Sequence, residues 1–488
     1  MTTSAVSFKI AYSKYLWSKN RCVLRSTKPR NVRCTAENFA CPIFPVEARL
    51  VSIKRCATAH LVEPQDVSPA SARVMVACHI GREVRWRNEL VHKRAGWGEI
   101  VMDLRKALCA TCLVCLVAGG SATAGTNDML IGLDSKVTFG PEGQINVAPA
   151  TDAVLVVDIS DPAKPRIRAN LPLTNSLLGP PTNLQITPDG KLGLVANSVT
   201  NVQDGNAWKA VPDNKLYVID LTAEPPKLID TVAVGRQPSG LSISKKGDLA
   251  LIANRDGKSV SVVSIRGTTV KAVAEVPVEQ QAAAVVIAPD GKRAFVCLNL
   301  ANKIGVLSID GETVTYDKSL DIPSAFNPYN IDITPDGKYV IASNTGAGKN
   351  NADAEVVIEA TGPHPHVVDV MSPGVGPEGF AIAPDGKTAA APLLLGTSAK
   401  DSDWFKTKTG ELALLSIGEG GKLTVVSRAP LGGLPEGVVY SPNSDYLYVG
   451  NYIDQDLQVF SLAGGKLTEV GTKLKLPGQP ASMRGPVR

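Results

Sequence analysis

Histidine and cysteine are scarce in most of this 488-residue sequence: after residue 125 only Cys297, His364 and His366 remain. No internal disulfide can form there, so Cys297 is expected to be a buried apolar residue. The His364-Pro-His366 pair lacks a third ligand and makes an incomplete metal site. No G-x-S-x-G, Walker A, H-E-x-x-H or C-x-x-C motif follows residue 125 either, so the local signatures of several enzyme classes are absent.

Excess positive charge is also missing from this part of the chain. Residues 125–488 hold 32 Lys and Arg against 38 Asp and Glu, a net charge of −6, which argues against nonspecific nucleic-acid binding. Residues 1–100 hold 17 basic and 7 acidic residues and differ sharply in composition. The whole-chain charge of +5 therefore averages two unlike regions.

A targeting segment separates the two regions. Residues 102–124 combine the basic pair Arg105-Lys106, an apolar run at 107–118 and a small-residue site ending at Ala124, as in a secretory signal peptide. The run is shorter than the roughly 20 residues that a membrane span needs. We therefore predict translation from Met102, a mature chain starting at Gly125, and a periplasmic or secreted protein. Residues 1–101 then are spurious upstream translation, the alternative being a genuine basic, disordered segment or transit peptide.

A repeated turn dominates the remaining sequence. It occurs in six copies spaced 44 to 58 residues apart: LQITPDGK at 184, LSISKKGD at 241, VVIAPDGK at 285, IDITPDGK at 331, FAIAPDGK at 380 and VVYSPNSD at 438. Pro, Asp and Gly supply the fixed φ, the side-chain acceptor and the positive φ of a tight turn between antiparallel strands. Each copy is followed by further Val- and Ile-rich strands, so the repeat predicts four-stranded antiparallel units.

Such units bury their apolar faces by packing radially, which predicts an all-β, seven-bladed β-propeller over residues 125–488. A seventh first strand lies at PGQPASMRG, residues 477–485, with no strands after it. Its partners are expected at the other end of the domain: a second strand within residues 128–139, a third at 153–159 and a fourth at 165–173. The last blade is thus predicted to close with strands from both termini, which removes exposed edges.

The PDGK turn and strands such as LYVGNYIDQDLQVFSL closely resemble the YVTN-type repeats of bacterial seven-bladed propellers, a group similar to lactonase-like and quinoprotein-like propellers. The resemblance covers residues 128–488. It is specific for the fold and weak for function, because one propeller architecture hosts many activities.

Counting back from each turn places one residue of every blade at the entry to the central channel. Two carboxylates, Glu378 and Glu436, fall on adjacent blades, and Tyr329 and Asn330 lie on the blade before them. Paired carboxylates can perform acid–base chemistry or hold a cation. The plain alternative is a solvated channel mouth. Together with Asn183 these are candidate ligand-binding residues, and Glu378 and Glu436 are also catalytic candidates.

Three long connections between second and third strands lie on the same face, at residues 201–214, 345–354 and 396–410. Long loops on a rigid scaffold are candidate binding loops, and Trp208 and Trp404 are expected to anchor a ligand or partner, or else to pack on their own blades. Arg236 and Arg255 are expected in loops of this face and are candidates for oxyanion stabilisation.

These observations favour an exported, non-enzymatic propeller that binds an unidentified protein or small molecule through its loop-rich face. The alternative, implied by the resemblance, is a lactonase-like hydrolase or lactonizing enzyme. Such enzymes place His, Arg and Glu around the channel, and no channel-entry position here is histidine. A second alternative is the propeller subunit of a redox complex. The residues predict no resident metal or cofactor; calcium is the cation that the carboxylates would suit.

Overall fold

The computed structural model describes residues 127–149, 152–175, 179–471 and 473–487. All of them lie in the second of two compact units, Leu108–Arg488. The predicted signal peptide at 102–124 and the segment 1–101 fall outside the described residues. Within the described part, no helix is long and apolar enough to cross a membrane.

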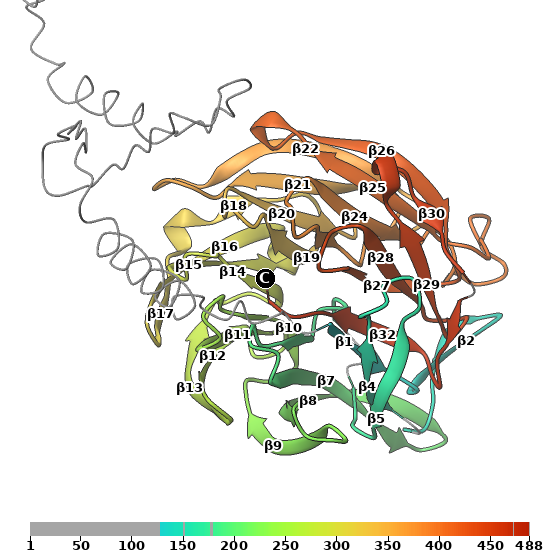
Figure 1. Ribbon diagram of the computed structural model, residues 1–488, viewed down its shortest axis with the longest axis horizontal. Helices are drawn as coiled ribbons and strands as arrows, with labels where there is room; N and C mark the ends of the chain where they lie inside the picture. The colour runs from blue at the N-terminus through green and yellow to red at the C-terminus, as the bar shows by residue number, and fades with distance from the viewer. Residues whose placement is uncertain (1–126, 150–151, 176–178, 472, 488) are drawn as a thin grey trace, which may run out of the picture. The chain divides into compact units, whose positions relative to one another are not determined.

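Seven four-stranded antiparallel blades form a ring, as predicted (Figure 1). In six of them the chain runs in order from the inner to the outer strand. Blades 1 to 3 consist of β6 (Leu184–Ile186), β7 (Leu192–Asp204), β8 (Ala207–Asp220) and β9 (Lys227–Ala233); β10 (Pro238–Ile243), β11 (Leu249–Asn254), β12 (Ser259–Arg266) and β13 (Thr269–Pro277); and β14 (Ala282–Ile287), β15 (Arg293–Leu298), β16 (Lys303–Asp310) and β17 (Thr313–Tyr316).

The next three blades follow the same order. Blades 4 to 6 consist of β19 (Pro328–Ile333), β20 (Tyr339–Asn344), β21 (Asp353–Glu359) and β22 (His366–Gly374); β23 (Ala381–Ile382), β24 (Thr388–Leu393), β25 (Glu411–Ile417) and β26 (Leu423–Pro430); and β27 (Pro435–Tyr440), β28 (Tyr446–Asn451), β29 (Asp456–Ser461) and β30 (Thr468–Glu469). Short additions are β18 (Ile322–Pro323), β31 (Leu474–Lys475) and the 3-10 turns η2 (Asn299–Ala301), η3 (Lys318–Leu320), η4 (Glu419–Gly421) and η5 (Ala463–Gly465).

Blade 7 joins the two ends of the domain, as predicted. Its inner strand is β32 (Pro480–Arg484), which pairs with β1 (Asp128–Leu133), followed by β4 (Ala153–Asp158) and β5 (Arg166–Leu171). Figure 1 shows the red β32 beside the N-terminal strands. The second strand, β1, lies within the predicted range 128–139 and ends at Leu133, where the chain leaves the sheet. It then forms a separate hairpin of β2 (Val137–Gly140) and β3 (Gly143–Asn146).

The repeated turn folds as its residues dictate. In blade 1 the Thr187 hydroxyl donates to Asp189 Oδ1 at 2.7 Å, and the Gly190 amide donates to the Thr187 carbonyl at 2.8 Å. Gly190 has φ of +72°, which favours glycine. The same bonds recur in blade 4 from Thr334 and Gly337.

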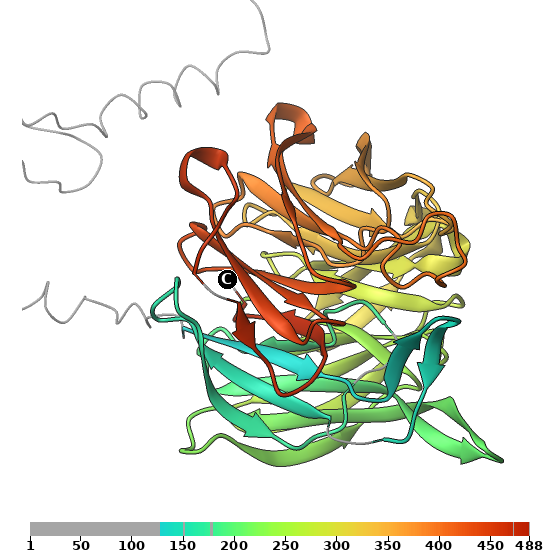
Figure 2. The ribbon, with the colours of Figure 1, turned by 90° about the vertical axis from the view of Figure 1, so that its right-hand side faces the viewer.

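Antiparallel topology sorts the connections onto two faces. The repeated turns and the third-to-fourth-strand turns lie on one side, which we call the turn face. The second-to-third connections and the entries to the inner strands lie on the other, the loop face. The long connection at 201–214 is an extension of the β7–β8 ladder, and it lies beside the β2–β3 hairpin on this face (Figure 2).

The core is a ring of interfaces between neighbouring blades. Seven clusters of buried aliphatic and aromatic side chains each join one blade to the next. Blades 2 and 3, for example, meet through Val260, Val262 and Val296, all fully buried. Cys297 is a free, buried cysteine in the following interface, as expected. This packing fixes the inner strands that line the channel.

Candidate active site

Two carboxylates from neighbouring blades meet at the loop-face mouth of the channel. Glu378 lies three residues before β23, which begins at Ala381, and Glu436 is the second residue of β27. A glycine follows each, and both are needed for close approach: a Cβ on Gly379 would lie 2.0 Å from the Glu436 carbonyl oxygen, and one on Gly437 would lie 2.7 Å from Met483. The two Glu-Gly pairs therefore let the inner strands pack tightly and bring the carboxyl groups together.

Both carboxylates line one cavity of about 170 Å³. Tyr329 from β19 and Asn183 from the entry of β6 line it as well. The Glu378, Glu436 and Tyr329 side chains are half-buried, because each is surrounded by protein and opens onto the cavity. Four of the residues selected from the sequence thus share one space.

Burial sets the electrostatics of the pair. It raises the pKa of Glu378 to about 7, although a hydrogen bond from Tyr329 and the charge of Arg255 both favour the ionised form. Burial likewise raises the pKa of Glu436 well above its usual range, and the charges of Glu378 and Asp134 raise it further. Because only Glu378 has favourable partners, it ionises first, and Glu436 keeps its proton near neutral pH.

Arg255 reaches this site through Tyr329. Its guanidinium lies 5.3 Å from the centroid of the Tyr329 ring, in a cation–π contact. One terminal nitrogen donates to Gln281 at 3.4 Å, while Nε and Nη1 are buried with no hydrogen-bond partner among the described residues. Arg255 does not line the cavity, so it orients Tyr329 and stabilises negative charge on Glu378.

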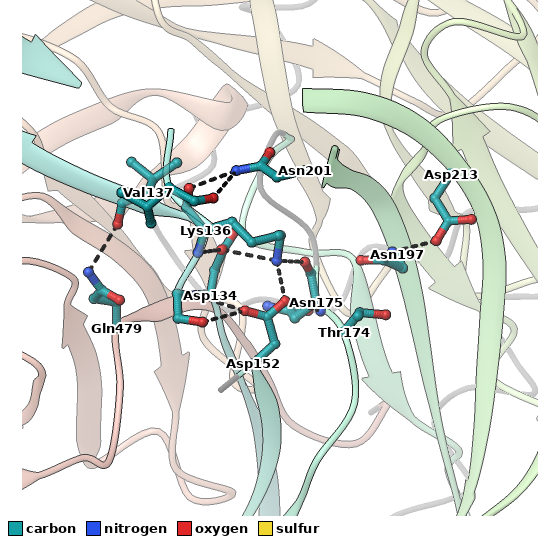
Figure 3. A network of polar contacts seen from close by, with 12 residues as sticks. Asp134, Lys136, Val137, Asp152, Thr174, Asn175, Asn197, Asn201, Asp213 and Gln479 are labelled. Carbon is teal, nitrogen blue, oxygen red and sulfur yellow. Dashed lines mark hydrogen bonds and ion pairs between the residues drawn. The ribbon is translucent and has the colours of Figure 1, made fainter. Parts of the chain in front are cut away.

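Figure 3 shows a buried polar network around Lys136 that the sequence analysis missed. Lys136 is fully buried and donates to the Asn175 carbonyl at 2.7 Å, while it pairs with Asp134 at 3.1 Å and with Asp152. Burial raises the pKa of Asp134 to about 7, against the opposing charge of Lys136. Asp134 in turn raises the pKa of Glu436. These residues are far from Glu436 in sequence, so no local motif revealed them.

The β2–β3 hairpin forms one wall of the cavity. Val137 and Phe139 line it, and Phe139 packs edge-on against Tyr452 with 6.0 Å between ring centroids. The Tyr452 hydroxyl donates to the backbone carbonyls of Asp134 and Val137 at 3.3 and 3.4 Å. Asn201 fastens the base of the hairpin to the β7–β8 extension through two 2.9 Å bonds to backbone carbonyls. The hairpin therefore excludes water from one side of the carboxyl pair.

The other residues selected from the sequence lie around this site or apart from it. Asn330 is buried and supports Glu378 by donating to its backbone carbonyl at 3.2 Å. Arg236 is exposed and pairs with Asp256 at 2.7 Å, outside the cavity. Trp208 is half-buried on β8, whereas Trp404 is 82% exposed and contacts Phe405 edge-on.

Metal ligands are sparse. In the described residues, no group of three or more His, Cys, Asp or Glu side chains is placed to hold a metal ion. His364 and His366 are both exposed and lie at the β21–β22 turn, on the face opposite the cavity.

The ring of seven blades and its channel-mouth site place the chain among seven-bladed β-propellers that resemble the lactonase family. A family model described as "Lactonase, 7-bladed beta-propeller" matches residues 266–351. None of the curated proteins matches the sequence.

Solved structures show the same fold. A candidate 6-phosphogluconolactonase from Bacteroides fragilis is similar at 19% identity, with a TM-score of 0.56, over 74% of this chain and 98% of that one. The periplasmic gluconolactonase of Pseudomonas aeruginosa is similar at 18% identity, with a TM-score of 0.53, over 73% and 98%. A protein of unknown function from Desulfotomaculum acetoxidans is similar at 15% identity, with a TM-score of 0.53, over 74% and 100%.

Proposed function

We propose that the protein hydrolyses small lactones at the loop-face mouth of its channel. The observation that carries the proposal is the pair of half-buried carboxyl groups, Glu378 and Glu436, which line one cavity. Burial raises the pKa of both groups, and only Glu378 has partners that favour its ionised form. An ionised carboxylate beside a protonated one provides a base and an acid in the same space. The likeness to the lactonase family supports this alternative over the non-enzymatic binding protein that the sequence favoured.

The reaction follows from these protonation states. Glu378 takes a proton from a water molecule, whose oxygen forms a bond to the lactone carbonyl carbon. As the tetrahedral intermediate collapses, the bond between that carbon and the ring oxygen breaks, and Glu436 donates its proton to the departing oxygen. The product is a hydroxy acid, and proton exchange with solvent restores both side chains.

Tyr329 and Arg255 support the base. The Tyr329 hydroxyl donates to Glu378 and fixes the orientation of the carboxylate, while the positive charge of Arg255 keeps the pKa of Glu378 lower than burial alone would set it. The wall formed by Phe139 and Val137 excludes bulk water, which strengthens these interactions.

The cavity indicates the class of lactone. At about 170 Å³ it is smaller than the roughly 300–1,000 Å³ sites of drug-sized ligands, so a single small ring suits it. None of the described residues that line it is basic, and two of them are acidic. A phosphate group would meet repulsion here, so we propose an unphosphorylated sugar-type lactone as substrate.

We also propose that the protein works outside the cytoplasm. The signal-peptide pattern at residues 102–124 supports this, as does the likeness to a periplasmic gluconolactonase. Mass spectrometry of protein recovered from a periplasmic or secreted fraction tests it, and the expected N-terminal residue is Gly125. A mature chain that begins within residues 1–101 would contradict the proposal.

Steady-state hydrolysis of glucono-δ-lactone tests the enzymatic proposal, with the spontaneous rate subtracted. We expect Glu378→Gln and Glu436→Gln each to lower kcat by about 10²–10⁴-fold. Glu419→Gln, at an exposed carboxylate on the turn face, is the matched control and should keep full activity. The phosphorylated lactone should be the poorer substrate. If the unmodified protein turns over no lactone, or either variant keeps its full rate, the proposal fails.

A binding role for the loop face is the second candidate, and Trp404 favours it. This side chain is 82% exposed in the 396–410 loop, which leaves a large aromatic surface free to contact a partner.

A further inference from the structure

A second cavity of about 160 Å³ lies at the other end of the channel, at the turn face. We call it the lower cavity. Its lining includes residues that follow the channel-entry positions by three along the inner strands, and the prolines of the repeated turns. These lining residues include Gln185, Ser242, Asp332 and Arg484, with Pro289, Pro335 and Pro384 from the turns.

A bulge explains why residues three apart share the channel. The pairing of β19 with β20 shifts register between Pro328 and Asn330. Side chains alternate along a regular strand, so an extra residue brings Tyr329 and Asp332 to the same side. Tyr329 therefore lines the cavity at the loop face, which we call the upper cavity, and Asp332 lines the lower one.

The lower cavity holds two opposite charges that do not touch. Asp332 accepts hydrogen bonds from the backbone amides of Ile333 and Ile382, both at 2.9 Å. Arg484, three blades away on β32, donates to the Leu241 carbonyl at 2.7 Å. Among the described residues no direct hydrogen bond or ion pair joins the two side chains. The backbone of the ring thus holds each charge in place on its own side.

This arrangement costs free energy without a bridging group. Buried opposite charges normally pair, because desolvation is otherwise uncompensated. Here burial raises the pKa of Asp332 and lowers the pKa of Arg484, and each charge only partly offsets the effect on the other. Lys245 also lines the cavity, and it is exposed at the rim.

Polar groups gather on the side of Arg484. Gln185 accepts the Ile243 amide at 2.9 Å through its oxygen, which leaves its NH₂ group for a ligand. Ser242 accepts the Ile287 amide at 3.1 Å, which leaves its hydroxyl as a donor. These two residues and Arg484 come from three consecutive blades and all offer donors. Asp332 on the far side accepts.

We propose that the lower cavity binds a small zwitterion of the amino-acid type, with its carboxylate against Arg484, Gln185 and Ser242 and its ammonium group against Asp332. Such a ligand compensates both half-buried charges at once. The site is separate from the lactone site and does not depend on the proposed hydrolysis.

Isothermal titration calorimetry with a series of straight-chain ω-amino acids, from glycine to 6-aminohexanoate, tests the proposal and measures the span between the charges. We expect one chain length to bind best. The alkyl carboxylate and the alkylamine of that length should each bind at least tenfold more weakly. This comparison uses the unmodified protein and needs no variant.

Variants then locate the site. Arg484→Gln and Asp332→Asn should each weaken the best ligand at least tenfold, whereas Arg266→Gln, at an exposed arginine on the same face, should not. Circular dichroism melts establish that each variant is folded. If no ω-amino acid binds, if the carboxylate alone binds as tightly, or if folded Arg484→Gln and Asp332→Asn proteins bind like the parent, the proposal is wrong.

Discussion

Charges that are removed from solvent are normally paired with opposite charges. The two ends of the channel depart from this pattern in opposite ways. At the loop face the ring brings two like groups, Glu378 and Glu436, into one cavity. At the turn face it keeps two opposite groups, Asp332 and Arg484, from meeting. Neither arrangement stabilises the fold. Both persist because packing between blades fixes the inner strands, whatever the electrostatic interactions of the channel side chains. Ionisable groups in such unfavourable positions are typical of binding and catalytic sites.

Lys136 provides the contrast, because this buried charge is paired. Replacing it by Met leaves Asp134 and Asp152 buried without their cation, so we expect Lys136→Met to lose about 3–5 kcal/mol of unfolding free energy. Urea unfolding measures the loss. Lys191→Met, at an exposed lysine, is the control and should change stability by no more than about 0.5 kcal/mol. A similarly small loss for Lys136→Met would mean that the network does not stabilise the fold.

Glu355 tests whether an unpaired buried carboxyl outside the channel simply weakens the protein. It is fully buried with Ser343 as its hydrogen-bond partner, and burial raises its pKa to about 8. Between pH 4.5 and 8 the folded state holds the proton that the unfolded chain releases, so stability falls as pH rises.

The variant Glu355→Gln lacks this titration. Relative to the parent, we expect it to gain up to about 1.4 kcal/mol per pH unit across that window and nothing below it. Thermal melts of both proteins from pH 4 to pH 9 give the difference. A gap that stays constant with pH would show that Glu355 is ionised in the folded protein.

The pH dependence of lactone hydrolysis tests the upper end of the channel. Activity should rise through pH 7 as Glu378 ionises, and fall at higher pH as Glu436 loses its proton. Arg255→Gln removes the charge that favours ionised Glu378, so the rising limb should move to higher pH by a fraction of a unit to about one unit. If the rising limb does not move, Arg255 does not lower the pKa of Glu378.

Trp404 should have the smallest effect on stability. Because its side chain is 82% exposed, Trp404→Ala should change the unfolding free energy by about 0.5 kcal/mol or less in urea melts. A loss of 2 kcal/mol or more would show that the indole ring of Trp404 packs on its own blade, and Trp404 would then not be a residue that binds a partner.

The sequence predicted the fold because blade structure is local. Pro-Asp-Gly turns and apolar strands recur every 44 to 58 residues, and a first strand without followers required partners at the other end of the domain. Counting back from each turn to the channel-entry position led to Tyr329, Glu378 and Glu436.

The rest of the site could not be predicted, because it is made by contacts between distant segments. Lys136 and Asp134 reach the carboxyl pair only through the ring closure and the β2–β3 hairpin, which carries no repeat signal. The positions of the Asp332 and Arg484 side chains could be predicted only with knowledge of a bulge that shifts the strand register. Counting by alternation places them on the wrong side of their strands.

The pairing of β32 with β1 also determines when the two cavities are completed during translation. A nascent chain that has reached residue 470 already contains six blades, yet it has an open gap and lacks the arginine at position 484. Neither cavity has its full lining until that strand emerges, since Ala481 belongs to the upper one and Arg484 to the lower. Chains released before that strand emerges would contain six blades, yet neither cavity would be fully lined.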